Sequence, residues 1–294
     1  MWLIYALLGA FTKSFGSVYR KPLGESIDVV EGVWLSHGFS VLVFIVILLF
    51  TDQLSDLVGI AYEYFWIALV ASMIGITAQY AFLIAAKLDD VSRVVALFSF
   101  IPVINMFGSA FFLDEIPSLF GLLGVFLVVA GTYTVYLETT TNRRWFDPFM
   151  ILVKSKSFPF VVIVVVCWGI IPIIDKSSVV DINLVVWGTY VVSMMWLIMS
   201  LVVLAKTVKT QRLPKFTKKP LGSAMKVGLG EGLGYMFGLM ALSQAYVAYA
   251  QSLRRFDILF SAGLSRIILK EKVSMNHIYG VIIMIAGTIA IALA

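Results

Sequence analysis

Long apolar runs separated by short polar breaks make up nearly the whole chain. A helix needs about 20 apolar residues to cross the hydrocarbon core of a bilayer. The polar stretches at 138–157 and 206–220 are too short to hold a soluble domain, so the sequence predicts an all-α polytopic membrane protein. The length rule gives ten transmembrane helices, at residues 1–19, 29–50, 63–86, 91–113, 117–137, 158–175, 184–205, 222–243, 246–269 and 274–293.

Composition supports this class. The chain is 61% hydrophobic and 13% charged, whereas soluble domains have about 45–50% apolar and about 25% charged residues. The net charge of +5 would suggest a nucleic-acid partner in a soluble protein. Here we expect no nucleic acid, because the basic residues crowd into loops beside apolar spans and indicate a lipid bilayer as the partner. The N-terminus lacks a basic n-region and an A-x-A cleavage site, so we expect a retained helix.

The predicted loops differ in charge between the two sides of the bundle. The positive-inside rule places the basic side in the cytoplasm and both termini outside a cell (plasma or inner) membrane. The basic side holds Arg20, Lys21, Lys87, Arg143, Arg144, Lys154, Lys156, Lys206, Lys209, Arg212, Lys215, Lys218, Lys219, Lys270 and Lys272. The other side holds Asp52, Asp56, Asp114, Glu115, Asp175 and Asp181, with Lys176 as its main basic residue.

The second half of the chain repeats the first. An odd number of spans per copy puts the copies in opposite orientation, so we predict two inverted five-helix repeats, 1–140 and 158–294, joined by a cytoplasmic linker at 141–157. A shift of 156 places Phe100 on Phe256, Glu115 on Glu271, Gly124 on Gly280, Gly131 on Gly287 and Thr132 on Thr288.

Each half closes with a glutamate, a glycine nine residues on and Gly-Thr seven residues beyond. The stretch LSRIILKEKVSMNHIYGVIIMIAGTIAI (264–291) and its weaker copy AFFLDEIPSLFGLLGVFLVVAGTY (110–133) resemble the EamA-like branch of the drug/metabolite transporter superfamily. The resemblance implies transport through a central cavity, lined mainly by the first, third and fourth helices of each half, with the fifth helices as scaffold. Family members of this length usually keep both termini inside, and the loop charges of this chain depart from that pattern.

The segment SLRRFD (252–257) places three charges inside the ninth span. An ionisable group at that depth costs several kcal/mol unless it has a partner or faces water, so it marks a site by default. Arg254 and Asp257 are three residues apart, share a helix face and are expected to pair, whereas Arg255 needs another partner. Because guanidinium binds carboxylate or phosphate through a planar fork, we predict an anion site. The alternative is a helix that begins near Phe256, with both arginines at the membrane interface.

Three further ionisable residues lie inside predicted spans. Lys13 is about 18 Å along the first helix, near mid-bilayer unless the helix is tilted towards the basic side. Glu231 lies in the glycine-rich stretch 228–238, where the glycines are expected to allow close helix packing. It would either neutralise one of the SLRRFD arginines or carry a coupling proton. His37 is either a packed residue or a proton relay.

Other polar and aromatic residues complete the predicted site. Gln79 and Tyr80 are polar groups at depth, and the resemblance implies that they face the cavity together with Trp168 and Tyr235. Trp187 is typical of an interfacial aromatic belt. The predicted substrate-binding residues are thus Lys13, Gln79, Tyr80, Trp168, Glu231, Tyr235, Arg254, Arg255 and Asp257, with Glu231, Asp257 and His37 as candidates for proton coupling.

The intramembrane charges leave a surplus of +1, from Lys13, Arg254 and Arg255 against Glu231 and Asp257. A carboxylate or phosphate would offset it, so we predict a secondary transporter that moves a small organic anion or zwitterion, such as an amino acid or a sugar phosphate, by alternating access. The alternatives are a proton-coupled exporter of amphipathic cations and a non-transporting scaffold or lipid-handling protein.

Enzyme signatures are missing from the sequence: it has no HExxH, no CxxC pair, no P-loop and no nucleophile elbow. We therefore expect no enzymatic activity, no metal and no cofactor. Inverted halves can close a cavity within one chain, so a monomer is expected.

Overall fold

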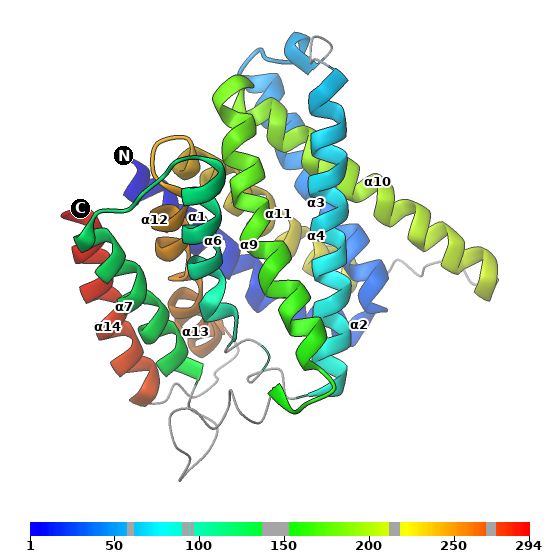
Figure 1. Ribbon diagram of the computed structural model, residues 1–294. Helices are drawn as coiled ribbons and strands as arrows, with labels where there is room; N and C mark the ends of the chain where they lie inside the picture. The colour runs from blue at the N-terminus through cyan, green and yellow to red at the C-terminus, as the bar shows by residue number, and fades with distance from the viewer. Residues whose placement is uncertain (58–61, 90–93, 95–96, 137–152, 212–217, 269–274) are drawn as a thin grey trace.

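The computed structural model describes residues 1–57, 62–89, 94, 97–136, 153–211, 218–268 and 275–294, and over these residues the chain is helical without a strand (Figure 1). The first half holds α1 (Trp2–Val18), α2 (Arg20–Ser26), α3 (Val29–Phe50), η1 (Ser55–Leu57), α4 (Tyr62–Leu88), η2 (Leu97–Phe100), α6 (Ile101–Phe112) and α7 (Leu119–Tyr136). The second holds α9 (Phe158–Asp181), α10 (Leu184–Thr210), α11 (Lys218–Leu242), α12 (Val247–Arg254), α13 (Asp257–Ile268) and α14 (Met275–Ala292).

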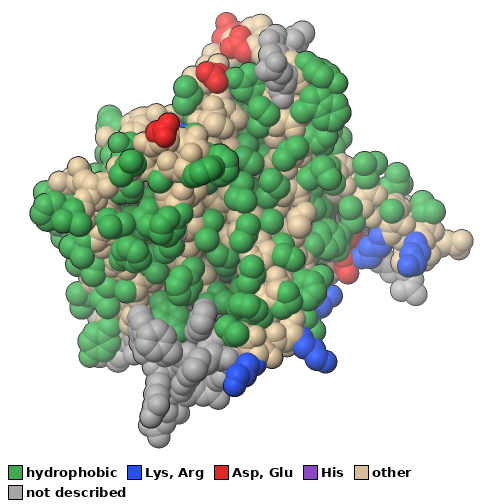
Figure 2. Space-filling view, in the orientation of Figure 1, with side chains coloured by type: hydrophobic (Ala, Val, Ile, Leu, Met, Phe, Trp, Pro, Cys, Tyr) green, Lys and Arg blue, Asp and Glu red, His purple; other side chains and the backbone are tan. Residues whose placement is uncertain are grey.

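Apolar sequence and local caps determine where these helices run. By length and composition, four of the described helices could cross a membrane: α3, residues 64–88 of α4, α9 and α10. The side chains of Asp28 and Asn183 accept hydrogen bonds from the backbone of Val30 and Val185, and so cap α3 and α10. Figure 2 shows hydrophobic side chains over most of the surface between an acidic upper end and a basic lower end.

The last helices of the two halves are related by one offset. The helices α6 and α13 begin at Ile101 and Asp257 and end at Phe112 and Ile268, so both limits are 156 residues apart. The limits of α7 and α14 differ by the same number. The helix α1 runs away from the end that carries both termini, whereas α9 runs towards it, so the repeat is inverted as predicted (Figure 1).

The fifth helices of the two halves, α7 and α14, lie side by side at one edge of the molecule (Figure 1). Their glycines meet backbone to backbone: a Cβ on Gly131 or Gly280 would lie 2.7 Å from the carbonyl oxygen of the other. Gly124 and Gly287 form the equivalent contact, at 2.6–2.7 Å. The two glycines of the pattern in each half thus serve close helix packing in a scaffold.

The helix α11 is inserted between α1 and α3, and its alternating glycines make this possible. A Cβ on Gly230 would lie 2.5 Å from the backbone nitrogen of Gly16 on α1, and one on Gly228 would collide with the Ser36 carbonyl of α3. The predicted packing role of the glycines is therefore confirmed. Because α11 packs closely on both α1 and α3, its residue Glu231 lies near the side chains of α1 that face the centre of the protein.

Candidate functional site

A cavity of about 510 Å³ lies at the centre, lined by side chains from both halves but by none from α7 or α14. It is lined by the first, third and fourth helices of each half and also by the second helices, α3 and α10. Tyr80 does not line it, because it lies about 100° around α4 from Gln79, and that prediction was wrong. The predicted residues that do line it are Lys13, His37, Gln79, Trp168, Glu231, Tyr235, Arg254, Arg255 and Asp257.

The SLRRFD segment joins two short helices. The helix α12 ends at Arg254 and α13 begins at Asp257, so the chain is interrupted inside the predicted span. The eight residues of α12 give about 12 Å of helix before the interruption. A helix does begin beside Phe256, as in the interface alternative, but α12 precedes it within the predicted span and both arginines line the central cavity. Arg254 lies at a helix C-terminus and Asp257 at a helix N-terminus, where the helix dipoles favour their charges.

Asp257 is bound by α1. Its Oδ2 atom accepts a hydrogen bond from Lys13 Nζ at 2.6 Å, and its backbone oxygen accepts one from Ser14 Oγ at 2.7 Å. The predicted pair of Arg254 with Asp257 is not formed, and the Asp257 carboxylate pairs with Lys13 instead.

Glu231 is bound by Arg20, a residue that we had expected in a loop. Its Oε1 atom accepts hydrogen bonds from Arg20 Nε at 3.0 Å and Nη2 at 2.5 Å, so Glu231 forms its ion pair with a base outside the SLRRFD segment. The short helix α2 follows α1 after Tyr19 and places Arg20 in the cavity wall. His37 Nε2 lies 3.1 and 3.4 Å from the amide nitrogen and oxygen of Gln79.

Arg254 has an unsatisfied guanidinium. It makes no hydrogen bond to the described residues, and its Nε atom is buried. Gly238 provides the space that it occupies, since a Cβ there would lie 2.8 Å from Arg254 Nη1. Gln251, one turn earlier on α12, also lines the cavity, and its Nε2 atom is buried without a described partner. Two unpaired N–H donors on one helix face fit a ligand that supplies acceptors.

Asp175 was predicted in an outer loop, and this was wrong. The helix α9 continues to Asp181, and Asp175 is 2% exposed and lines the cavity. Its Oδ1 atom accepts hydrogen bonds from Trp187 Nε1 at 3.0 Å and from Tyr235 Oη at 2.8 Å. Trp187 is therefore buried rather than part of an interfacial belt. The sequence gives little signal for this position, because an apolar run precedes Asp175 but a lysine and two serines follow it directly.

Comparison with known proteins gives the family. The family model described as "EamA-like transporter family" matches residues 1–137 and 156–293. The chain belongs to the EamA-like transporter family. This family is part of the drug/metabolite transporter superfamily, and its members are membrane transporters rather than enzymes.

A crystal structure of another protein, titled only "Crystal structure of protein", has the same fold as this EamA-like transporter. It matches with a TM-score of 0.78 over 99% of this chain and 96% of its own, at 12% sequence identity. A search of the curated proteins gives no match. At this identity the structural likeness establishes the fold alone.

In this EamA-like transporter the cavity is closed at the end that carries the termini. Lys176, predicted in an outer loop, is buried in α9, where it forms an ion pair with Glu115 and donates to the Ala245 carbonyl at 2.6 Å. Glu115 Oε2 accepts a hydrogen bond from the backbone nitrogen of Val247 at 2.7 Å and so satisfies a free donor at the start of α12. These contacts join α9 to segments of both halves.

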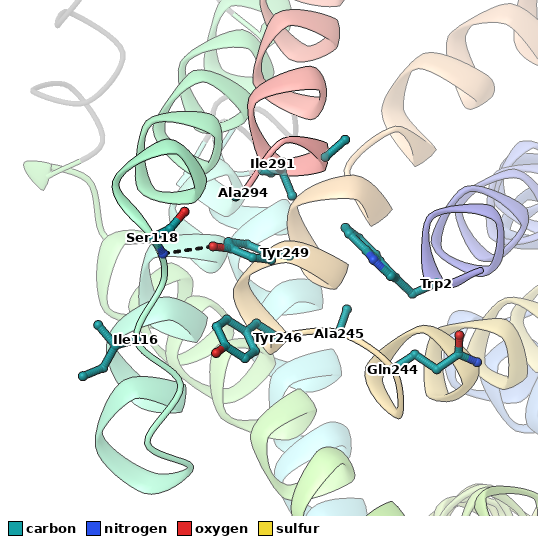
Figure 3. A pocket seen from close by; sticks show the side chains of 10 residues that line it. Trp2, Ile116, Ser118, Gln244, Ala245, Tyr246, Tyr249, Ile291 and Ala294 are labelled. Carbon is teal, nitrogen blue, oxygen red and sulfur yellow. Dashed lines mark hydrogen bonds between the residues drawn. The ribbon is translucent and has the colours of Figure 1, made fainter.

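A second cavity, of about 420 Å³, lies near both termini (Figure 3). The rings of Trp2 and Tyr249 stack at a centroid distance of 6.5 Å, and Tyr249 Oη accepts a hydrogen bond from the backbone nitrogen of Ser118 at 3.2 Å. The side chains that line it are uncharged. Within the described ranges, no group of His, Cys, Asp and Glu residues could hold a metal ion. The central cavity is therefore the candidate site.

Proposed function

We propose that this EamA-like transporter moves a small organic anion or zwitterion, such as an amino acid or a sugar phosphate, by alternating access through the central cavity. The observation that carries the proposal is the guanidinium of Arg254, which lines the cavity without a hydrogen bond from the described residues. Asp257 and Asp175 lie within electrostatic range of this charge but accept no hydrogen bond from it, and buried donors without an acceptor are unfavourable. A carboxylate or phosphate of the substrate would supply both charge and acceptors, and Gln251 adds a donor beside it.

The charges of the cavity support an anion. If all ionise, the lining holds four cations, Lys13, Arg20, Arg254 and Arg255, and three carboxylates, Asp175, Glu231 and Asp257, which leaves one positive charge. The ion pairs of Lys13 with Asp257 and Arg20 with Glu231 each neutralise two charges. The surplus expected from the sequence is thus retained with different members, and a singly charged anion would cancel it.

Loop charge supports an orientation for the proposed transporter. Acidic side chains gather at the upper end in Figure 2, and Lys and Arg side chains at the lower end and on the end of α10. We propose that the basic end faces the cytoplasm of a cell membrane and that both termini lie outside. Inverted units at 1–140 and 158–294 would form the cavity within a monomer.

Uptake into proteoliposomes tests the function, with radiolabelled L-glutamate, L-leucine and glucose 6-phosphate as probes. We expect saturable uptake of at least one probe. A hydrogen bond to a charged group is worth about 1.5–3 kcal/mol, so Arg254→Gln should lower its affinity about 10- to 150-fold. Arg255→Ala should also weaken it. Arg266→Gln, a change at an exposed arginine of α13, is the matched control and should leave uptake unchanged. Unchanged uptake of every probe by Arg254→Gln would refute the site.

The two alternatives predict different results. A proton-coupled exporter of amphipathic cations predicts that Glu231→Gln abolishes drug resistance while Arg255→Ala does not. The ion pairs of Glu231 and Asp257 weigh against it, because neither carboxylate offers an uncompensated charge to a cation. A non-transporting scaffold predicts charges paired among helices without a cavity, whereas the charged residues here line one.

A further inference from the structure

Asp175 differs from the other buried carboxylates of the described bundle. Glu115 is bound to a lysine, Asp257 to a lysine and Glu231 to an arginine. Asp175 forms no ion pair with the part of the chain that the structure describes, and its hydrogen bonds come from two neutral groups, an indole N–H and a phenol O–H. Both reach Oδ1, so Oδ2 of this cavity residue accepts no hydrogen bond from described groups.

The surroundings of Asp175 contain few charges. Tyr235 faces it from α11 and Arg254 lies within electrostatic range on α12, whereas α10 brings only the indole of Trp187. The described parts of α4, α6 and η2 bring no charged group to it. On α9 itself, Lys176 is the next residue but is bound to Glu115 and to a backbone carbonyl.

Opposing effects therefore act on the protonation of this carboxylate. Burial favours the neutral acid, since an unpaired charge loses its hydration. The two donated hydrogen bonds and the nearby guanidinium favour the ionised form. A carboxyl in a cavity under such opposing influences is a candidate for functional proton exchange.

We propose that Asp175 is the proton-binding residue of this transporter and that a proton and the anionic substrate are carried together. The coupling rests on the proposed function, whereas the proton site does not. On one side of the membrane, hydronium in the cavity transfers its proton to a carboxylate oxygen of Asp175, which forms an O–H bond and releases water. On the other side, water takes the proton back and the carboxylate is restored.

Arg254 links the proton to the substrate. Ionised Asp175 partly offsets the guanidinium charge, and protonation removes this offset, so that an anion binds Arg254 more tightly. By reciprocity, a bound anion raises the affinity of Asp175 for the proton by the same factor. Both ligands therefore bind in the same conformational state, which gives symport.

Infrared spectroscopy of the purified protein in lipid tests the proton site without a substrate. As the pH is lowered, we expect the C=O stretching band of a protonated carboxyl that is absent in Asp175→Asn. Asp181→Asn is the matched control on the same helix, where an exposed carboxylate accepts a hydrogen bond from Tyr64, and it should keep the band. In Tyr235→Phe, which loses a donor to the ionised form, the band should appear at higher pH.

The proton site is refuted if wild type and Asp175→Asn give the same spectra at every pH. If Asp175→Asn does not fold, the proton site is refuted equally when the C=O band of Tyr235→Phe appears at the same pH as that of the wild type.

Proteoliposomes with a trapped pH-sensitive dye test the coupling, with the same three probes. We expect a probe to drive proton entry in wild type but not in Asp175→Asn, and the variant should bind that probe with an affinity independent of pH. Wild-type uptake that is equal with and without a pH gradient overturns the coupling. If no probe is taken up, the proposed function and the coupling both fail, and the infrared band still decides the proton site.

Discussion

Replacing Lys176 by Met should destabilise this transporter far more than the same change at an exposed lysine. Lys176 and Glu115 form an ion pair with side chains only 16% and 7% exposed. Removing one partner of a buried pair costs about 3–5 kcal/mol, because the remaining charge loses its counterion away from water. Lys176→Met also leaves the Ala245 carbonyl without its donor. Both losses weaken the contact that closes the cavity at the terminal end.

Thermal unfolding in detergent, followed by intrinsic fluorescence, measures the effect. At about 2–4 °C per kcal/mol, the apparent Tm of Lys176→Met should fall by about 6–20 °C. Lys206→Met is the matched control, because Lys206 pairs with Asp28 in a contact whose side chains are 35% and 47% exposed. Such a surface pair contributes about 0–1 kcal/mol, so the control should lose less than about 4 °C.

A double-variant cycle separates the charge effect from lost packing. Glu115→Gln leaves a buried lysine unpaired and should also be severe, whereas Glu115→Gln/Lys176→Met leaves no uncompensated charge. We expect the double variant to lose clearly less stability than the sum of the single variants. The buried ion pair would be refuted as the contact that closes the cavity by either of two results. Lys176→Met and Lys206→Met would lower the Tm equally, or the stability losses of the two single variants would add up to that of the double variant.

Four further variants test packing, the anion site and acid stability. Gly131→Ala should lower the Tm, because its Cβ would lie 2.7 Å from a backbone oxygen of α14, whereas Gly222→Ala, with open space within 4 Å, should gain up to about 1 kcal/mol of helix propensity. Gly238→Ala should weaken anion binding in a thermal-shift assay at little cost in stability, because only the guanidinium of Arg254 must move. Burial, the largest influence on Asp28, raises its pKa, but hydrogen bonds from its lysine partner and from the backbone outweigh it and lower the pKa below 3.8. Its stabilisation is therefore present above pH 3.8 and lost in more acidic solution, so a Tm–pH profile of Asp28→Asn should lack this loss.

Hydrophobic pattern and repeat were enough to predict the bundle, because each span is a long apolar run and a side chain facing lipid must be apolar. The interruption of the ninth span could not be read in this way, since apolar residues continue on both sides of Arg255 and Phe256. The repeat places η2 and the start of α6 at the equivalent position of the first half.

The partners of the buried charges were the part that sequence could not supply. Asp175 and Lys176 resembled loop residues because a charge count alone ends a span there. They lie within α9 because other segments supply their partners. Trp187 and the more distant Tyr235 donate hydrogen bonds to Asp175, and the distant Glu115 supplies the counter-charge for Lys176. Pattern indicates that a buried charge needs a partner, whereas only the packed chain decides which one it has.

The ion pair of Lys176 with Glu115 has a counterpart in the ion pair of Arg20 with Glu231, and the two differ in exposure. Arg20 lies just after α1 and Lys176 lies near the end of α9, the first helices of the two halves, and each base bonds a glutamate. In an inverted repeat the ends of these two helices face opposite ends of the pathway. The Lys176 side chain is 16% exposed, whereas that of Arg20 is 51% exposed and lines the cavity. Under the proposed alternating access, the structure therefore corresponds to the state closed on the side of the termini and open on the side of the basic loops.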